Sequence, residues 1–514
     1  RTMCGIIGFA GNTEAVPMLL DGLERLEYRG YDSAGVAVAS PEGRLQVKKC
    51  KGRLGVLREA LAAQKPLTGQ VGIGHTRWAT HGEPNDVNAH PHVSQSGKLA
   101  VVHNGIIENY LEIKQSLLHK GVVFASDTDT EVIVQLLEYY YKKSSNLMDA
   151  VYEVLNRIKG AYAMGILCSD FPEQLIAVRK DAPLLIGYGA DGNYIASDVT
   201  ALLAHTRTVT YMEDDEVAVV TADHVQILGR DGCFLEKEKH QIQWDVSAAE
   251  KGGYAHFMLK EIMEQPEAVR RTIQPRLADG EIVFEELEDE RDLMKGISRI
   301  YLVACGSAYH VGMIGKYALE RLLGIPVEAC LASEFRYSGP LLGESALVIV
   351  ISQSGETLDS MAALREAKRR GSKVLSIVNV MGSSIARESD HVLYTWAGPE
   401  IAVATTKAYT TQTVLLLMLG VYLARRLDRI GNGEYQEIVR ELHGLHERIG
   451  MVLKNLELYQ KTVARYFNHD SVFYIGRNQD YALGMEGSLK LKEISYIHSE
   501  SYAAGELKHG TISL

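Results

Sequence analysis

The chain has 514 residues, of which 46% are hydrophobic and 23% charged, and its 54 basic and 65 acidic side chains give a net charge of −11. This length suggests about three folding units with a sizeable buried core. The composition excludes a disordered chain, a collagen-like fibre and a disulfide-stabilised miniprotein. The negative charge argues against nucleic acid or an acidic membrane surface as a partner.

The longest apolar run, residues 414–424, is too short to span a bilayer and predicts a buried helix. The first residues lack the pattern of a secretory signal. The six cysteines are widely spaced and include no CxxC pair, which is typical of reduced thiols. We therefore expect a cytoplasmic protein that has no membrane partner.

Residues 4–244 predict many strands with few helices between them. Short alternating or apolar runs, separated by Gly and Asp/Asn turns, predict strands at 4–10, 33–39, 71–79, 98–107, 161–168, 174–178, 194–197 and 216–220. Helical periodicity is found at 13–27, 110–120, 129–142 and 147–159. This pattern predicts an α+β layered fold.

The start of the chain suggests a nucleophile. If Met3 is removed, Cys4 carries a thiol and a free α-amine, whose ordinary pKa is roughly 7.7–8.0. That amine can accept the thiol proton, so the residue is its own nucleophile and base. Arg1 and Thr2 precede Met3, and while they are attached the nitrogen of Cys4 is a non-basic amide. A buried structural cysteine on a first strand is the alternative.

Two loops carry groups suited to an amino-acid substrate. The motif HTRWATHG places Arg77, Thr80 and His81 together, as donors for a carboxylate. The motif HNG supplies the side-chain amide of Asn104 and the backbone N–H of Gly105, which can form an oxyanion hole. A surface ion pair and an ordinary turn are the structural alternatives.

Asp129 stands at a predicted helix start, where its carboxylate can receive a substrate ammonium or simply act as an N-cap. A papain-like pairing is a further alternative for the nucleophile. It is weaker, because that chemistry does not require a cysteine beside a start methionine. It would join Cys4 to His75, His81 or His103.

Together, Cys4-Gly5-Ile6, LEYRGYDSAG, HTRWATHG, HNG and TDTE resemble the class II glutamine amidotransferases with the N-terminal-nucleophile (αββα) fold. The resemblance implies that Cys4 attacks the glutamine carboxamide and that Asn104 and Gly105 hold the oxyanion. The resemblance also implies that the loop of Trp78 closes over glutamine and that Arg29 helps to order the surroundings of the nucleophile. The residues that it implies bind glutamine are Arg29, Arg77, Trp78, Thr80, His81, Gly105 and Asp129.

After residue 253 the rhythm becomes strand, Gly-rich turn and helix. Strands are predicted at 300–305, 346–352, 373–379 and 391–397, with helices ending near 323 and 370 and a long helix at 405–426. This predicts a doubly wound parallel sheet at 286–430, after a linker with first helices at 245–285. A helical stretch, 434–467, follows.

A further strand, 471–476, opens another helix, and its VFYIGR weakly repeats IYLVACG of the first α/β unit. We expect that residues 431–514 begin a second α/β unit whose sheet is incomplete, so the chain looks C-terminally truncated. The alternative is that this segment is an appendage of the first sheet.

The run ALVIVISQSGETLDS places hydroxyl side chains and a glycine at the N-terminus of a predicted helix. Such a terminus favours the binding of a phosphate group. A Ser/Thr-rich helix cap is the alternative. Further along, Glu486, Lys490 and Glu493 share one helix face by their spacing, either as a solvated surface or as a carboxylate base beside an ammonium. His509, in a Gly-flanked loop, has an ordinary pKa near neutrality and could transfer a proton.

These segments, with ACGSAYHVG, EIAVATTKAYTTQ and the stretch 485–510, resemble the sugar isomerase (SIS) domain. A glutaminase fused to SIS domains resembles the glucosamine-6-phosphate synthase family, which implies that ammonia released from glutamine crosses an internal channel to fructose 6-phosphate. The resemblance implies that Glu493 is the isomerising base, Lys490 assists proton transfer and His509 opens the ring. The residues that it implies contact the sugar phosphate are Ser307, Ser352, Gln353, Ser354, Thr357, Val403 and Glu493.

The resemblance also implies a homodimer without metal or other cofactor. The chain departs from the family at Ala308, where a hydroxyl is usual, and at Thr511, where proline is usual. The lysine that forms the sugar imine in the family comes from a tail beyond residue 514, so we expect weakened synthase activity if the molecule ends there. Rival functions are an amidotransferase acting on phosphoribosyl pyrophosphate or aspartate, whose loops we do not find, and a phosphosugar sensor.

Overall fold

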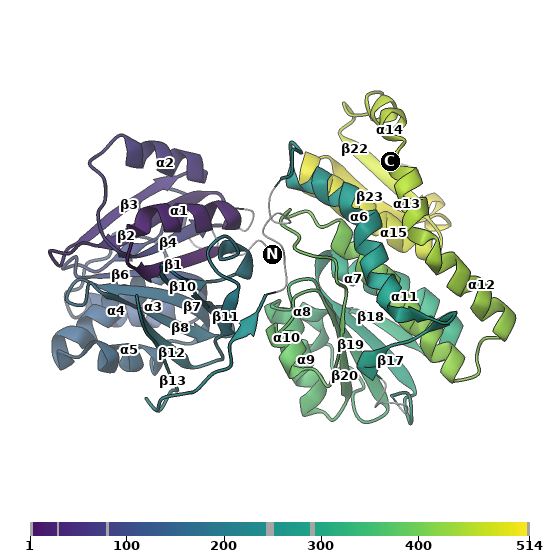
Figure 1. The fold of residues 1–514 in the computed structure, drawn as a ribbon, viewed down its shortest axis with the longest axis horizontal. Helices are drawn as coiled ribbons and strands as arrows, with labels where there is room; N and C mark the ends of the chain where they lie inside the picture. Colours follow the sequence, from purple (N-terminus) through teal and green to yellow (C-terminus); the bar gives the residue numbers. More distant parts are fainter. Residues whose placement is uncertain (1–3, 28–29, 79–81, 243–250, 288–292, 511–514) are drawn as a thin grey trace. The chain divides into compact units, whose positions relative to one another are not determined.

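The computed structural model describes residues 4–27, 30–78, 82–242, 251–287 and 293–510. The chain separates into two compact units, residues 1–249 and residues 250–514 (Figure 1). Among the described residues, no helix is both long enough and apolar enough to cross a membrane.

The first unit contains two stacked antiparallel sheets. The eight-stranded sheet has the order β14-β11-β9-β10-β1-β4-β2-β3, and the six-stranded sheet has the order β13-β12-β8-β7-β6-β5. The strands of the first sheet are β1 (Gly5–Gly11), β2 (Ser33–Ala39), β3 (Leu45–Lys51), β4 (Val71–Arg77), β9 (Leu185–Tyr188), β10 (Gly192–Ala196), β11 (Thr208–Tyr211) and β14 (His240–Gln241). Those of the second are β5 (His92–Val93), β6 (Leu99–Ile107), β7 (Gly160–Cys168), β8 (Gln174–Lys180), β12 (Glu216–Thr221) and β13 (Val225–Leu228).

Helices cover the outer face of each sheet (Figure 1). They are α1 (Ala15–Leu26) and α2 (Leu54–Ala62) beside the first sheet, and α3 (Tyr110–Leu118), α4 (Asp129–Ser144) and α5 (Leu147–Leu155) beside the second. The alternation along β6 shows why the layers form: Ala100 and Val102 pack between the sheets, whereas Leu99 and Val101 pack toward α4 and α5. This four-layer arrangement confirms the expected αββα fold.

The second unit is built on a parallel five-stranded sheet of order β18-β17-β19-β20-β21. Its strands are β17 (Arg299–Ala304), β18 (Val327–Leu331), β19 (Ala346–Ser352), β20 (Lys373–Val378) and β21 (His391–Tyr394). One face of the sheet packs on α7 (Gly306–Leu323) and α11 (Lys407–Arg426), with α6 (Phe257–Ile273) beside them. The other packs on α8 (Ala332–Phe335), α9 (Leu358–Arg369) and α10 (Ser384–Glu388).

Residues alternate between these two cores along β17: Ile300 and Leu302 face α7, and Tyr301 and Val303 face the opposite layer. The doubly wound sheet is therefore confirmed. The predicted strand 391–397 was too long: β21 ends at Tyr394, and Trp396 adopts a left-handed conformation at φ 55° that a strand cannot continue through.

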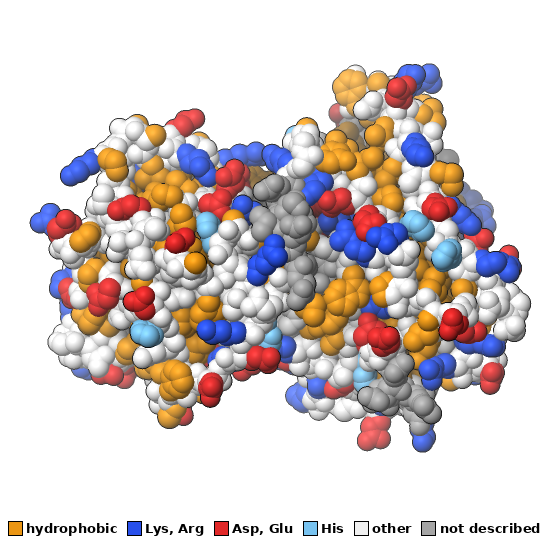
Figure 2. Space-filling view, viewed as in Figure 1, with side chains coloured by type: hydrophobic (Ala, Val, Ile, Leu, Met, Phe, Trp, Pro, Cys, Tyr) orange, Lys and Arg blue, Asp and Glu red, His pale blue; other side chains and the backbone are white. Residues whose placement is uncertain are grey.

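The C-terminal part begins with three helices, α12 (Asn432–His443), α13 (Leu445–Leu453) and α14 (Leu456–Val463). Then β22 (Ser471–Gly476) and β23 (His498–Ala503) flank α15 (Gln479–Ser495) and pair in parallel as a separate two-stranded sheet. Hydrophobic side chains reach the surface in this region (Figure 2), among them Leu458, Val463, Phe473 and Ile475.

Candidate functional site

Cys4 immediately precedes β1, which lies in the middle of the first sheet. Its Sγ accepts a hydrogen bond from the backbone N–H of Trp78 at 3.2 Å. Burial, and to a smaller extent the carboxylate of Asp32, raise the pKa of the Cys4 thiol to about 11. The resting thiol is therefore neutral and needs a base at hand, which its own α-amine would provide if the bond to Met3 were cleaved. Met3 lies outside the described residues.

Asn104, on β6 of the second sheet, reaches Cys4 of the first. Its Nδ2 donates to the carbonyl oxygen of Cys4 at 2.8 Å, and its Oδ1 lies 3.0 Å from Nε2 of His75. Burial lowers the pKa of His75 to about 3, so the ring is neutral and its Nε2–H donates to this oxygen. The described contacts of His75 thus orient Asn104 and do not point to a papain-like pair with the sulfur.

Gly105 follows in a backbone conformation that favours glycine. Its φ is +129°, and a Cβ would lie 2.0 Å from the carbonyl oxygen of Ala161. Asn104 is buried while Gly105 is exposed, so the two donors predicted for an oxyanion stand at the boundary of the core. This position suits groups that must be held rigidly and still meet a substrate.

Asp129 begins α4 and is buried. Its Oδ2 accepts a hydrogen bond from the N–H of Ile107 at 2.9 Å. The N-cap of α4 is instead Thr128, whose hydroxyl accepts from the N–H of Glu131. Asp129 is therefore not needed as the cap, and its carboxylate is fixed near the end of the strand that carries Asn104.

Arg77 is the last residue of β4, is buried, and donates from Nη2 to the carbonyl oxygen of Gly82 at 3.2 Å. The next residue, Trp78, packs edge-on against Tyr31 with ring centroids 5.1 Å apart. Three further predicted site residues, Arg29, Thr80 and His81, lie outside the described residues.

A cluster of four buried histidines underlies the site, and the sequence analysis did not predict it. His90 packs between His75 and His92, with ring centroids 4.1 and 4.8 Å away, and its Nδ1 faces the N–H of His103. Burial lowers the pKa of all four rings. Within the described residues no group of three or more His, Cys, Asp or Glu is placed to hold a metal.

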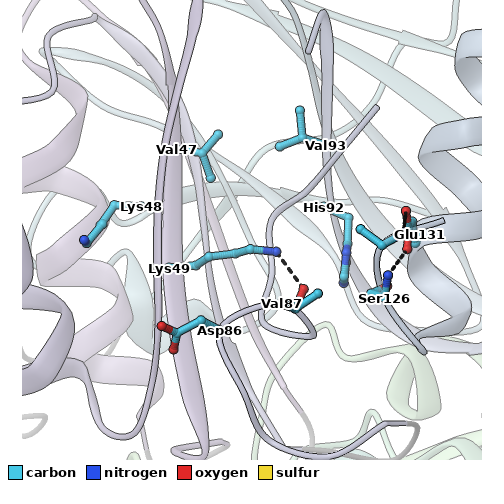
Figure 3. Close-up of a pocket in the computed structure, with 10 residues that line it drawn as sticks. Val47, Lys48, Lys49, Asp86, Val87, His92, Val93, Ser126 and Glu131 are labelled. Carbon is cyan, nitrogen blue, oxygen red and sulfur yellow. Dashed lines mark hydrogen bonds between the residues drawn. The ribbon is translucent and has the colours of Figure 1, made fainter. Parts of the chain in front are cut away.

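A cavity of about 510 Å³ lies beside His92 (Figure 3). Lys49 from β3 extends along it and donates from Nζ to the carbonyl oxygens of Val87 and Ala89, at 2.9 and 2.7 Å. Burial lowers the pKa of Lys49 to about 8. The lysine thus fixes the chain that connects the loop of Arg77 to the histidine cluster.

In the second unit, β17 and β19 are neighbouring strands of the sheet. The helix after β17, α7, packs on one face, and the helix after β19, α9, packs on the other, so a topological switch point lies between the two strands. Ligands of doubly wound sheets bind outside the carboxyl ends of the strands at such a point. The glycine-rich turn at Gly306 and the loop after Ser352 both start there. The fold therefore brings together the two turns that the sequence analysis singled out.

The loop after β19 is held by its own hydroxyls. Ser352 Oγ accepts from the N–H of Gly355 at 3.1 Å and lies 3.1 Å from Thr357 Oγ1, while Ser354 Oγ accepts from the N–H of Glu356. Thr357 is the N-cap residue of α9 but makes no side-chain capping hydrogen bond. Gln353 accepts from the N–H of Asn379 through its backbone carbonyl.

The charged face of α15 packs against the start of α7. Glu486 is buried and accepts from Ser307 Oγ at 2.8 Å and from His310 Nδ1 at 2.7 Å. Lys490 Nζ lies 3.6 Å from the same carboxylate and donates to Glu493. The predicted face is thus a connected row of charges. His310 was missed by the sequence analysis, although it stands in the quoted motif three residues after Ser307.

Three predicted sugar-site residues, Glu493, Val403 and His509, are exposed. The side chain of Val403 is 51% exposed in the segment before α11. His509 follows the short turn Glu506–Lys508, donates its N–H to Glu506, and has no described contact with α15. Thr511 lies outside the described residues.

Comparisons with known proteins connect both units to families. The sequence profile of the glutamine amidotransferase domain matches residues 67–237, and that of the SIS domain matches residues 293–422 and 466–514. Two bacterial proteins named glutamine–fructose-6-phosphate aminotransferase (isomerizing) are 53% identical, in Caldanaerobacter subterraneus subsp. tengcongensis, and 52% identical, in Clostridium acetobutylicum. Each match covers 100% of this chain and 84% of the relative.

A solved structure described as the C-terminal domain of glucosamine-fructose-6-phosphate aminotransferase from Francisella tularensis is also similar. Its TM-score is 0.50 at 40% identity, over 51% of this chain and 74% of that chain.

Proposed function

The chain belongs to the glutamine–fructose-6-phosphate aminotransferase (isomerizing) family, and we propose that its two units carry out successive halves of that reaction. It is an enzyme that transfers the amide nitrogen of glutamine to fructose 6-phosphate, yielding glutamate and glucosamine 6-phosphate. A glutamine amidotransferase domain in the same chain favours this function over a phosphosugar sensor.

In the first unit, the sulfur of Cys4 adds to the carboxamide carbon of glutamine while the α-amine takes the thiol proton. Asn104 Nδ2 and the N–H of Gly105 stabilise the resulting oxyanion. The intermediate expels ammonia, which carries away the transferred proton, and water then hydrolyses the thioester to glutamate. Arg77 is suited to the α-carboxylate of glutamine and Asp129 to its α-ammonium. Thr80, His81, Trp78 and Arg29 are assigned by resemblance to the same site.

In the second unit, ammonia condenses with the C2 carbonyl of fructose 6-phosphate and releases water. Glu493 then removes a proton from C1, and the electron pair forms an enaminol that is reprotonated at C2 to give the amino aldose. Lys490, in contact with Glu493, assists this transfer. Ser352, Gln353, Ser354 and Thr357 bind the phosphate at the start of α9. Ser307, Val403 and His509 complete the proposed sugar site, with His509 opening the ring.

The observation that carries the proposal is the 2.8 Å contact by which Asn104 of one sheet reaches Cys4 of the other. Two variants of the full chain test the division of labour. Cys4→Ala should abolish glutamate release and leave ammonia-dependent synthesis of glucosamine 6-phosphate intact. Glu493→Gln should abolish synthesis from either nitrogen source and leave glutamate release intact.

Glu457→Gln is the matched control, because this glutamate is 90% exposed on α14. It should leave both reactions unchanged. Equal loss of both reactions in Glu493→Gln would contradict the assignment of one half-reaction to each unit.

The cytoplasmic location, the homodimer and the lack of a nucleic-acid partner belong to the same proposal. The net charge of −11 supports the last of these, because a negatively charged chain is repelled by phosphate backbones. Sedimentation of the purified protein at micromolar concentration tests the dimer, with a monomer as the contradicting result.

A further inference from the structure

Four buried charged residues and one partly exposed glutamate form a network in the second unit. Lys260, Glu261, Glu400 and Lys407 are each at most 8% exposed. Glu264 pairs with both lysines, with Lys407 Nζ at 2.6 Å and Lys260 Nζ at 3.4 Å. Buried charges are costly unless they are paired or hydrogen-bonded, so the contacts of each carboxylate show what its charge stabilises.

The other two carboxylates, Glu261 and Glu400, accept hydrogen bonds from backbone N–H groups. Glu261 Oε1, on α6, accepts from the N–H of Ile401 at 2.5 Å and from that of Ala402 at 3.1 Å. Glu400 accepts from the N–H of Thr406 at 2.8 Å, just before α11. The segment 400–406 is therefore held at its beginning by α6 and at its end by its own glutamate. Val403, exposed at 51%, stands between these two attachments.

The surroundings of Glu261 move its pKa toward neutral pH. Burial and the neighbouring Glu400 raise the pKa of Glu261 to about 7, while the N–H groups of Ile401 and Ala402 and, less strongly, the ammonium of Lys407 oppose this rise. Lys260 and Glu264 of its own helix complete the charged surroundings. Near neutral pH the carboxylate is thus present in both forms, and the ionised form is the stronger hydrogen-bond acceptor.

We propose that Glu261 is a positioning residue that holds the segment 400–406 in place and thereby sets the affinity of the second unit for its sugar phosphate. The inference rests on the proposed function, which assigns Val403 to the sugar site. Glu261 itself does not touch the sugar; it acts through the two backbone amides that precede Val403.

The test uses the full chain with Glu261→Ala, Glu261→Gln and a matched control. The control is Glu267→Gln, on the same helix, where the glutamate is 46% exposed and pairs with Arg270. Hydrogen exchange of the amides of residues 401 and 402 reports the attachment, and calorimetry with glucosamine 6-phosphate reports the affinity. We expect exchange roughly tenfold faster and binding roughly tenfold weaker in Glu261→Ala, because two buried amides lose their acceptor.

Glu261→Gln decides the question even if the alanine variant does not fold. In the wild type and in Glu267→Gln, binding should strengthen between pH 6 and 8 more than ligand ionisation alone explains. In Glu261→Gln that additional strengthening should disappear, because the amide cannot ionise. Glutamine hydrolysis by the first unit should be unchanged in every variant.

Two results would overturn the inference alone: unchanged exchange at residues 401 and 402 in Glu261→Ala, or an identical pH dependence of binding in Glu261→Gln and Glu267→Gln. Failure of the wild type to bind glucosamine 6-phosphate would overturn the proposed function and the inference with it. The exchange measurement, which needs no ligand, distinguishes the two failures.

Discussion

The Nδ1 atom of His310 lies 2.7 Å from Oε2 of Glu486, although the two residues are 176 positions apart in the chain. This contact joins the second turn of α7 to the charged face of α15. The other carboxylate oxygen of Glu486, Oε1, lies 3.6 Å from Lys490 Nζ. By holding Oε2, His310 therefore orients the carboxylate that Lys490 contacts. We therefore expect the position of Lys490 beside Glu493 to depend on His310.

His310→Ala should lower kcat for ammonia-dependent sugar amination roughly tenfold or more, because small misplacements of reacting groups carry large rate penalties. KM for fructose 6-phosphate should change little. His310→Asn retains a donor near the position of Nδ1 and should recover most of the rate. If the alanine and asparagine variants had the same rate, the donor to Glu486 would have no role in positioning.

Asn104→Ala should reduce kcat for glutamine hydrolysis by about 100- to 1,000-fold, the usual loss when one oxyanion donor is removed. The effect should fall on kcat more than on KM, because the charge develops only in the transition state. Steady-state release of glutamate measures both constants. An intact ammonia-dependent reaction in the same variant would show that the second unit is undisturbed, whereas an unchanged kcat would exclude Asn104 from the oxyanion hole.

The histidine cluster should make the first unit sensitive to acid. Well above pH 6.5 the four rings are neutral in the folded and in the unfolded chain. At lower pH the histidines of the unfolded chain bind protons, whereas the buried rings of the folded chain stay neutral. For His75 this difference persists down to its folded-state pKa of about 3. The free energy of unfolding should therefore fall with falling pH, by up to about 1.4 kcal/mol per pH unit for each histidine.

Hydrogen exchange in β4 and β6 between pH 7 and 5 measures this loss. His90→Gln should reduce the slope of stability against pH, because one ring no longer titrates on unfolding. His119→Gln, which alters an exposed ring, should keep the wild-type slope. A wild-type slope in His90→Gln would mean that the acid sensitivity has another source.

Gly355→Ala should weaken binding of sugar phosphate in the second unit. A Cβ at this position would lie 2.0 Å from Ser383 Oγ, and the φ of +67° is itself strained for alanine. Gly371→Ala is the control, since Gly371 also has a positive φ, of +80°, but its Cβ would meet open space. Calorimetry with glucosamine 6-phosphate should show a loss for Gly355→Ala only, and equal affinities would exclude this loop from the phosphate site.

The regular elements were predictable where hydrophobic periodicity is strong. The predicted strand 33–39 coincides with β2, and the buried run 414–424 lies inside α11. The edge strand β3 was missed, because its LQVKKCK sequence carries three lysines and buries only Cys50. The strand β18 was missed because VEACL is short and buries only Val327 fully.

Within the site, residues in local motifs were predictable and residues that act across the fold were not. The spacing of Glu486 and Lys490 on one helix is visible in the sequence, whereas the contact of His310 with Glu486 depends on how two helices pack. Similarly, Glu261 reaches a backbone 140 residues away. One local signal could have helped: His75 precedes Arg77 by two positions on a strand, so both must face the same side.

The account depends most on Cys4 as the nucleophile that releases ammonia. The direct measurement is mass spectrometry of the active protein after incubation with the glutamine analogue diazo-oxo-norleucine. We predict a single adduct, on the sulfur of a Cys4 that carries a free α-amine, whose formation is prevented by excess glutamine. An adduct elsewhere, or unmodified Cys4 in a chain that begins at this residue, would contradict the account.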